Sequence, residues 1–109
     1  MNEKNINSEE KEPAYQELEY CVVSNKIMLE GQKIGFMYRE IPDEPGDSGW
    51  RILSGTENQQ YLDNPRNSGK YALKTIAEAD SAIIPYLPLP VGTDLERIEG
   101  KDDFLVYEE

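Results

Sequence analysis

The sequence of 109 residues contains no histidine and only one cysteine. Histidine is the commonest general base of enzymes and the commonest metal ligand, so its absence removes most hydrolytic and zinc chemistry. The single cysteine, Cys21, cannot form a disulfide within the chain, and one thiol without an imidazole argues against a zinc site. We therefore expect a domain that folds in the reduced state and without a metal ion.

Basic residues are scarce too. The chain has 11 Lys and Arg against 22 Asp and Glu, which gives a net charge of -11. Phosphate backbones and acidic membranes are bound through Lys and Arg, so we expect neither nucleic-acid binding nor membrane association. No apolar run reaches the ~20 residues that span a bilayer. The first residues lack the basic segment and apolar run of a secretory signal, which favours a cytoplasmic protein.

The length corresponds to one domain of ordinary size. One Trp, seven Tyr and two Phe supply enough aromatic surface for a core. Residues 1–19 hold six acids and two lysines and show no apolar periodicity. We expect this segment to be an acidic, mostly disordered tail, followed by a single domain over residues 20–107.

Three segments have the pattern of strands. Residues 20–24 form a short β-branched and aromatic run, and residues 33–40 and 50–54 alternate in polarity. In the second segment Ile34, Phe36 and Tyr38 share one face, and Lys33, Gly35, Met37 and Arg39 share the other. The loop at 42–49 joins the second and third segments into a predicted hairpin, and residues 94–107 predict another hairpin that turns at 99–101.

Short helices are predicted between the hairpins. Capping-box patterns begin at Thr56 and at Thr75, and the first predicts a helix over about residues 57–63. Asp80 favours a further helical turn, which Pro85 shortens, and residues 67–69 predict a turn. The mixed order of strands and helices, without a strand-helix-strand rhythm, predicts a small α+β domain with an antiparallel sheet and a few short helices.

Two segments resemble catalytic patterns without supporting them. Gly46-Asp47-Ser48-Gly49 is similar to the nucleophile stretch of trypsin-type proteases, but the chain has no imidazole to take the serine proton. A serine-lysine dyad is the formal alternative, whereas these residues are simply good turn formers. Cys21 lies in an apolar run, which predicts a buried thiol with a raised pKa rather than a nucleophile.

The acidic loop is the other candidate for chemistry. Asp43, Glu44 and Asp47 could hold a hard cation, but Pro45 stands where an EF-hand requires a ligand. A solvated acidic loop is the favoured interpretation. No glycine-rich phosphate cradle precedes a helix either. The sequence therefore predicts no catalytic residues, no metal ligands and no cofactor.

Several motifs together carry a family resemblance. They are Cys-Val-Val-Ser at 21–24, Gly-Phe-Met-Tyr-Arg-Glu-Ile-Pro at 35–42, Asp-Ser-Gly-Trp-Arg at 47–51 with Ser54, Gly55 and Glu57, Tyr-Leu-Asp-Asn-Pro at 61–65, Asn67, Ile-Ile-Pro-Tyr-Leu at 83–87 and Pro-Val-Gly at 90–92. Over about residues 20–105 the chain resembles a family of small bacterial proteins first described as a domain of unknown function. That family is number thirty-three among the immunity proteins of polymorphic toxin systems.

The resemblance implies a bacterial, cytoplasmic protein that is not an enzyme and that binds and neutralises a cognate toxin domain. An acidic surface rich in tyrosine would suit a basic nuclease as that toxin. The alternative is a small acidic binding module with an unrelated housekeeping role. The motif residues also have a structural interpretation, in which Asp47 and Ser48 order a turn, Gly49 takes a positive φ and Trp50 packs in the core.

The candidate partner-binding surface is the loop at 42–49 and its flanks, because loops on a rigid hairpin commonly carry binding. For Trp50 a core or half-buried position is favoured over an exposed one. The residues predicted to face the partner are Arg39, Glu40, Asp43, Glu44, Asp47, Trp50 and Glu57.

Overall fold

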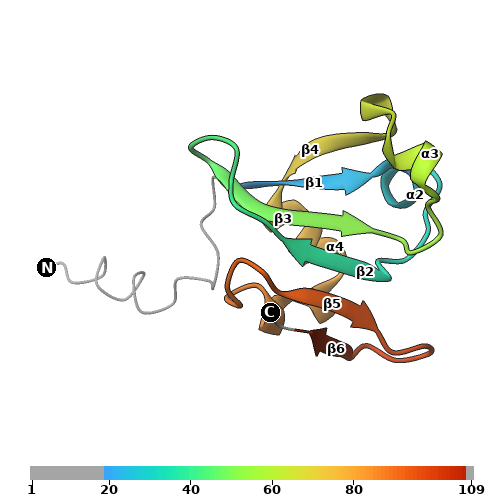
Figure 1. The fold of residues 1–109 in the computed structure, drawn as a ribbon. Helices are drawn as coiled ribbons and strands as arrows, with labels where there is room; N and C mark the ends of the chain where they lie inside the picture. Colours follow the sequence, from blue (N-terminus) through green and yellow to red (C-terminus); the bar gives the residue numbers. More distant parts are fainter. Residues whose placement is uncertain (1–18, 108–109) are drawn as a thin grey trace, which may run out of the picture.

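The computed structural model describes residues 19–107, which form a six-stranded sheet and several short helices (Figure 1). The predicted acidic tail lies outside the described residues, except for Glu19. The elements in chain order are β1 (Tyr20–Ser24), α2 (Asn25–Met28), β2 (Phe36–Arg39), β3 (Asp47–Leu53), α3 (Gln59–Leu62), the 3₁₀ helix η1 (Pro65–Asn67), β4 (Ser68–Ala72), α4 (Leu73–Ala79), the 3₁₀ helix η2 (Ser81–Tyr86), β5 (Asp94–Arg97) and β6 (Phe104–Tyr107).

The sheet has the strand order β4-β1-β3-β2-β5-β6. The two predicted hairpins are present, since β2 pairs antiparallel with β3 and β5 pairs antiparallel with β6. One pairing departs from the predicted antiparallel sheet: β1 lies parallel to β3, with Val22 opposite Arg51. This pairing follows from the chain path, because the chain returns through β2 before β3 runs beside β1. The α+β class is confirmed, with a mixed sheet.

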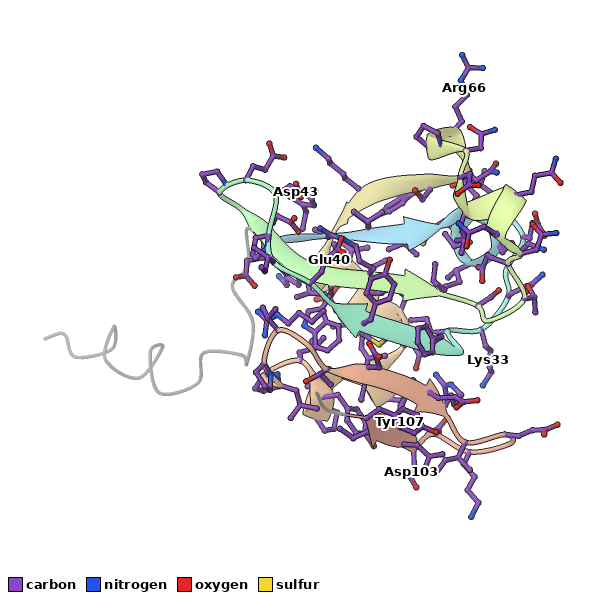
Figure 2. All side chains as sticks on the ribbon, viewed as in Figure 1. Lys33, Glu40, Asp43, Arg66, Asp103 and Tyr107 are labelled. Atoms are coloured by element: carbon purple, nitrogen blue, oxygen red, sulfur yellow. The ribbon has the colours of Figure 1, made fainter. Side chains whose placement is uncertain are left out.

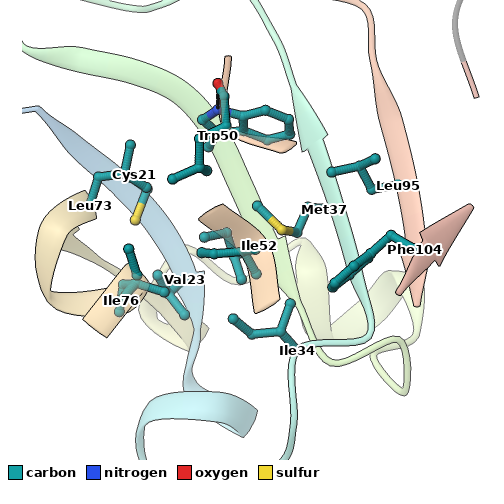
Figure 3. Packing of buried hydrophobic residues seen from close by; sticks show 13 residues of the cluster. Cys21, Val23, Ile34, Met37, Trp50, Ile52, Leu73, Ile76, Leu95 and Phe104 are labelled. Atoms are coloured by element: carbon teal, nitrogen blue, oxygen red, sulfur yellow. Dashed lines mark hydrogen bonds between the residues drawn. The ribbon is translucent and has the colours of Figure 1, made fainter. Parts of the chain in front are cut away.

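The core lies between the sheet and the helices α4 and η2, which are behind the sheet in the view of Figure 1. Most strand residues that point to this side are buried, as are Leu73, Ile76 and Ala77 of α4 (Figure 3). On β2 the core receives Met37, while Phe36 and Tyr38 point to the opposite face. The buried apolar residues are Cys21, Val23, Ile34, Met37, Trp50, Ile52, Leu73, Ile76, Ala77, Ile83, Leu87, Leu95 and Phe104.

The local structure between the hairpins differs from the predicted one in three places. Helix α3 is capped by the Asn58 side chain, which accepts a hydrogen bond from the Tyr61 amide, and not by Thr56. Helix α4 begins after Ala72, so Thr75 lies inside it rather than at its cap. Strand β4 starts at Ser68, where a turn was predicted, because pairing with β1 outweighs the weak local strand preference of Ser-Gly-Lys.

The helical turn predicted after Asp80 is confirmed as η2. The Asp80 carboxylate caps this helix by accepting a hydrogen bond from the Ala82 amide. Among residues 19–107, none of the helices has the length and apolar character that a bilayer crossing needs.

Candidate functional site

The predicted acidic loop is shorter than expected. Strand β3 already begins at Asp47, so the exposed connection between β2 and β3 covers residues 40–46. Asp43 and Glu44 are exposed, as predicted, and Ile41 beside them is 75% exposed. Figure 2 shows Asp43 at this end of the β2–β3 hairpin and Glu40 beside β3. Asp47 is different, because its side chain is 0% exposed.

Asp47 is buried beside Arg51, which lies four residues further along β3 and pairs with it. The two terminal nitrogens of Arg51, Nη1 and Nη2, donate to the Asp47 carboxylate at 3.0 and 2.8 Å. The Nε of Arg51 donates to Glu40 at 2.6 Å. The backbone amides of Asp43 and Gly49 complete the shell of Asp47, each at 2.8 Å. This network ties the loop to both strands of the hairpin.

The charges of this network stabilise each other. Hydrogen bonds from Arg51 hold the pKa of Asp47 far below its usual range, and the same contact raises the pKa of Arg51. At the tip of the loop, hydrogen bonds from Tyr20 and Lys70 lower the pKa of Glu44. Asp47, Arg51 and Glu44 are therefore ionised at neutral pH, and Glu44 presents negative charge to the solvent.

Trp50 and Arg39 lie on the core side of the hairpin. Trp50 is 0% exposed and its indole N–H donates to the Leu87 carbonyl at 3.2 Å. The guanidinium of Arg39 lies 5.6 Å from the Trp50 ring and donates to the carbonyls of Ser48 and Leu89 at 2.9 and 2.7 Å. The core position favoured for Trp50 is thus confirmed. Both side chains join η2 and the segment after it to the sheet.

The structural interpretation of the Asp-Ser-Gly-Trp-Arg motif is confirmed at each of its first four residues. The hydroxyl of Ser48, which is 1% exposed, accepts from the Trp50 amide, so it is not an accessible nucleophile. Gly49 has φ +87°, and a Cβ at this position would collide with the Glu40 carbonyl oxygen. Only glycine fits this close approach of β3 to the residue after β2.

Glu57 lies away from the acidic loop. It follows the far end of β3, about 20 Å along the strand at ~3.3 Å per residue. Burial alone would raise the pKa of Glu57, but hydrogen bonds from Ser24, Ser54 and nearby backbone amides lower it to about 2. Its carboxylate accepts from the amides of Ser54 and Gly55 at 2.9 and 3.0 Å. Glu57 therefore orders the turn after β3.

Within residues 19–107, the face of the sheet opposite α4 and η2 is largely uncovered, and we call it the open face. The strand registers align its side chains in two rows across the strands. One row runs from Lys70 through Val22, Arg51, Tyr38 and Asp94 to Tyr107, and the other runs from Leu53 through Phe36 and Glu96 to Leu105.

A hollow of about 380 Å³ lies at one end of the open face, where α3 and η1 rise beside the sheet. Its floor includes Tyr38, Arg51 and Leu53 of the sheet, and its walls include Tyr61 and Asn67. The polar groups of Arg51 are already bonded, so the hollow offers a mixed surface of aromatic and aliphatic side chains with amide and hydroxyl groups. A shallow site of this size suits a protruding side chain or a small ligand.

The described residues offer little for catalysis or metal binding. Within residues 19–107, no group of three or more His, Cys, Asp or Glu side chains has a geometry that could hold a metal ion. Cys21 is buried as predicted, and burial raises the pKa of its thiol to about 12. The thiol donates to the Tyr71 carbonyl at 3.5 Å. It is therefore a core residue and not a nucleophile.

The structure thus brings together Arg39, Glu40, Asp43, Glu44, Asp47 and Trp50 around one end of the hairpin, and it separates Glu57 from them. Only Glu40, Asp43 and Glu44 of this set are classed as exposed. Sequence reasoning missed the open face, above all Phe36, Tyr38 and Tyr107. The available signal was the alternation in residues 33–40, which put Phe36 and Tyr38 on one face together with Ile34. The placement of Ile34 was wrong, because it precedes β2 and is buried in the core.

Comparison with known proteins gave one match. The model of the immunity protein Imm33 domain matches residues 21–107, which is nearly all of the part that the structure describes. Neither the curated proteins nor the solved structures include a match.

Proposed function

The chain belongs to the Imm33 immunity protein family, and from this premise we propose that it binds a cognate toxin domain and neutralises it without catalysing a reaction. We place this action in the cytoplasm of a bacterium. The observation that carries the proposal is the extent of the match, since residues 21–107 include every strand but the first residue of β1. The domain that the family model matches is thus the whole folded part of residues 19–107. These residues contain no second domain that could have another role.

The architecture supports inhibition by binding. The residues that the sequence offered as candidates for chemistry stabilise the fold instead. Asp47 pairs with Arg51, the Ser48 hydroxyl accepts a hydrogen bond from the Trp50 amide, and Cys21 is buried. What the chain offers to a partner is surface, and that surface is strongly acidic. A basic toxin, such as a nuclease that binds phosphate backbones through Lys and Arg, would be attracted over several ångströms before contact.

The exposed part of the acidic loop belongs to this proposed surface. Glu40, Asp43 and Glu44 stand at one end of the hairpin and are held there by the buried network beneath them. A rigid loop loses little conformational freedom on binding, which favours affinity. Asp47, Trp50 and Arg39 support the loop from within, and Glu57 lies too far along β3 to share in this contact.

Co-expression tests the proposed function. Each reading frame adjacent to the gene is expressed from an inducible promoter in a bacterial host, and a frame whose product stops growth is the candidate toxin. Co-expression of the present chain should restore growth, whereas a housekeeping binding module should not. An unfolded control, such as the chain with Trp50→Ala, should fail to rescue. Absence of rescue from every growth-inhibiting neighbour would contradict the proposal.

The loop can be tested in the same complex. The double variant Asp43→Lys/Glu44→Lys should remain folded, since exposed substitutions usually change stability by under ~0.5 kcal/mol. Its association with a basic toxin should slow at low salt and approach the wild-type rate at high salt, where exposed charges are screened. Unchanged association at low salt would remove the loop from the interface.

A further inference from the structure

We propose that the open face of the sheet, and not the acidic loop alone, is the docking surface for the cognate toxin, and that the toxin meets it with a surface of apolar side chains bordered by Lys and Arg. This inference rests on the proposed function and specifies where and by what chemistry the toxin is recognised.

The first argument is the difference between the two faces of the sheet. Helices α4 and η2 cover the middle of one face, where the strand residues Val23, Met37 and Ile52 are 0% exposed. Among residues 19–107 the open face has no such cover, yet it carries large apolar side chains beside its charged ones, unlike a fully polar solvated face. It carries Phe36 and Tyr38 as neighbours, with ring centroids 6.2 Å apart.

The second argument is that apolar side chains recur on the edge strand, beyond the two carboxylates of β5. Leu105 and Tyr107 of β6 belong to the same two rows as Phe36 and Tyr38, and each is 48% exposed. At the other end Leu62 of α3 is 43% exposed beside the hollow. Half-exposed aromatic and aliphatic side chains thus lie on both sides of β5, which places Asp94 and Glu96 between them. Apolar side chains interspersed with a few charges, with a hollow at one end, have a composition that protein interfaces share.

The third argument is charge, which identifies the occupant. Among the described residues, the cations of the open face are Arg51 and Lys70, and each already contacts a carboxylate, Arg51 that of Asp47 and Lys70 that of Glu44. The carboxylates of Asp94 and Glu96 have no cation beside them among the described residues. The open face therefore carries excess negative charge between its apolar side chains. A complementary partner surface must supply cations.

The same charge argues against a second copy of this chain as the occupant. Two open faces brought together would oppose their unpaired carboxylates, in a chain with a net charge of -11. Like charges placed opposite each other in an interface disfavour association. A basic toxin domain meets no such penalty.

The test compares variants on the open face with matched variants elsewhere, in binding to the purified toxin domain that the chain neutralises. The first variant, Asp94→Lys/Glu96→Lys, reverses charge on the open face. Its control, Glu30→Lys/Glu78→Lys, makes the same change in net charge at exposed positions near α2 and on α4. The second variant is Tyr107→Ala. Its control is Leu29→Ala, which removes a side chain that is 74% exposed and lies after α2.

At about 50 mM salt, where the Debye length exceeds ~10 Å, the charge-reversal variant should bind at least about tenfold more weakly than the wild type. Tyr107→Ala should also weaken binding about tenfold, because aromatic residues in the apolar centre contribute most to affinity. Both controls should stay within about twofold. Unfolding curves measured by circular dichroism identify any variant whose fold is disturbed, and such a variant is excluded. If an open-face variant is excluded, Phe36→Leu takes its place.

Three outcomes would overturn the proposal. If the chain neutralises and binds the toxin but the open-face variants bind like the wild type, the docking surface lies elsewhere and the proposed function stands. If light scattering shows a dimer of the chain that Tyr107→Ala disrupts, the open face is covered by a second copy. If the chain neutralises no toxin, the proposed function fails and this inference fails with it.

Discussion

The buried Asp47–Arg51 pair should be the most sensitive polar contact in the molecule. Asp47→Ala leaves the Arg51 guanidinium, 7% exposed, with Glu40 as its remaining carboxylate at hydrogen-bond distance. The buried amide of Gly49 also loses its acceptor. Removing one member of a buried ion pair costs about 3 to 5 kcal/mol, which is a large part of the ~5 to 15 kcal/mol that stabilises a typical domain.

The assay is urea denaturation followed by the fluorescence of Trp50, which is the only tryptophan of the chain and is 0% exposed in the folded state. Small single domains usually unfold in two states, so the free energy of unfolding follows from linear extrapolation. The matched control is Asp43→Ala, since the Asp43 side chain is 81% exposed and lies 3.7 Å from Arg51. It should change the free energy of unfolding by less than ~0.5 kcal/mol.

A second variant separates the pair from the rest of the network. In Asp47→Ala/Arg51→Met no buried charge remains unpaired, so the double variant should recover part of the stability that Asp47→Ala loses. A loss below about 1 kcal/mol for Asp47→Ala, or equal losses for Asp47→Ala and Asp43→Ala, would refute the view that this pair holds the hairpin loop in place.

Three further predictions concern single positions and pH. Gly49→Ala should destabilise the domain by about 2 kcal/mol or more in the same urea assay, because of the positive φ and the collision with the Glu40 carbonyl; a neutral result would contradict this geometry. Thr93→Val should raise the melting temperature, with a gain of about 1 kcal/mol, because the Thr93 hydroxyl is buried without a hydrogen-bond partner among the described residues; a lower melting temperature would show that the hydroxyl is satisfied. Glu57 has a folded-state pKa of about 2 against an ordinary value of 4.5, so its contribution to stability is present above pH 4.5 and is lost as the pH falls toward 2. Unfolding free energies measured across this range should fall less steeply for Glu57→Gln than for the wild type, and parallel curves would contradict the assignment.

Local patterns predicted those parts of the fold that depend on local contacts. The alternation in residues 33–40 and 50–54 predicted the β2–β3 hairpin, because a period of two reports which residues share a face. The parallel pairing of β1 with β3 depends on contacts distant in sequence, which no local pattern reports. Strand β4 was missed because Gly69 and Lys70 have low strand preference, and the edge of β1 supplies its hydrogen bonds.

The candidate site was predicted in part for the same reason. The exposure of Asp43 and Glu44 followed from their loop composition. The burial of Asp47 did not, because four residues of a regular strand span about 13 Å, and the contact of Asp47 with Arg51 depends on the irregular register of β3 against β1. The open face was not predicted, because alternation along a strand shows which residues share a face of the sheet but not which of the two faces the helices cover. That choice is made by the packing of α4 and η2 on Met37 rather than on Tyr38.

Titration of the purified toxin domain with the purified chain, with the toxin's activity as the readout, tests the central claim most directly. A protein that neutralises by binding should abolish the activity in proportion to the amount added, with complete inhibition at one equivalent. Activity that persists at a large excess of the chain would contradict toxin neutralisation. Complete loss of activity at a small fraction of one equivalent would contradict a non-enzymatic mechanism.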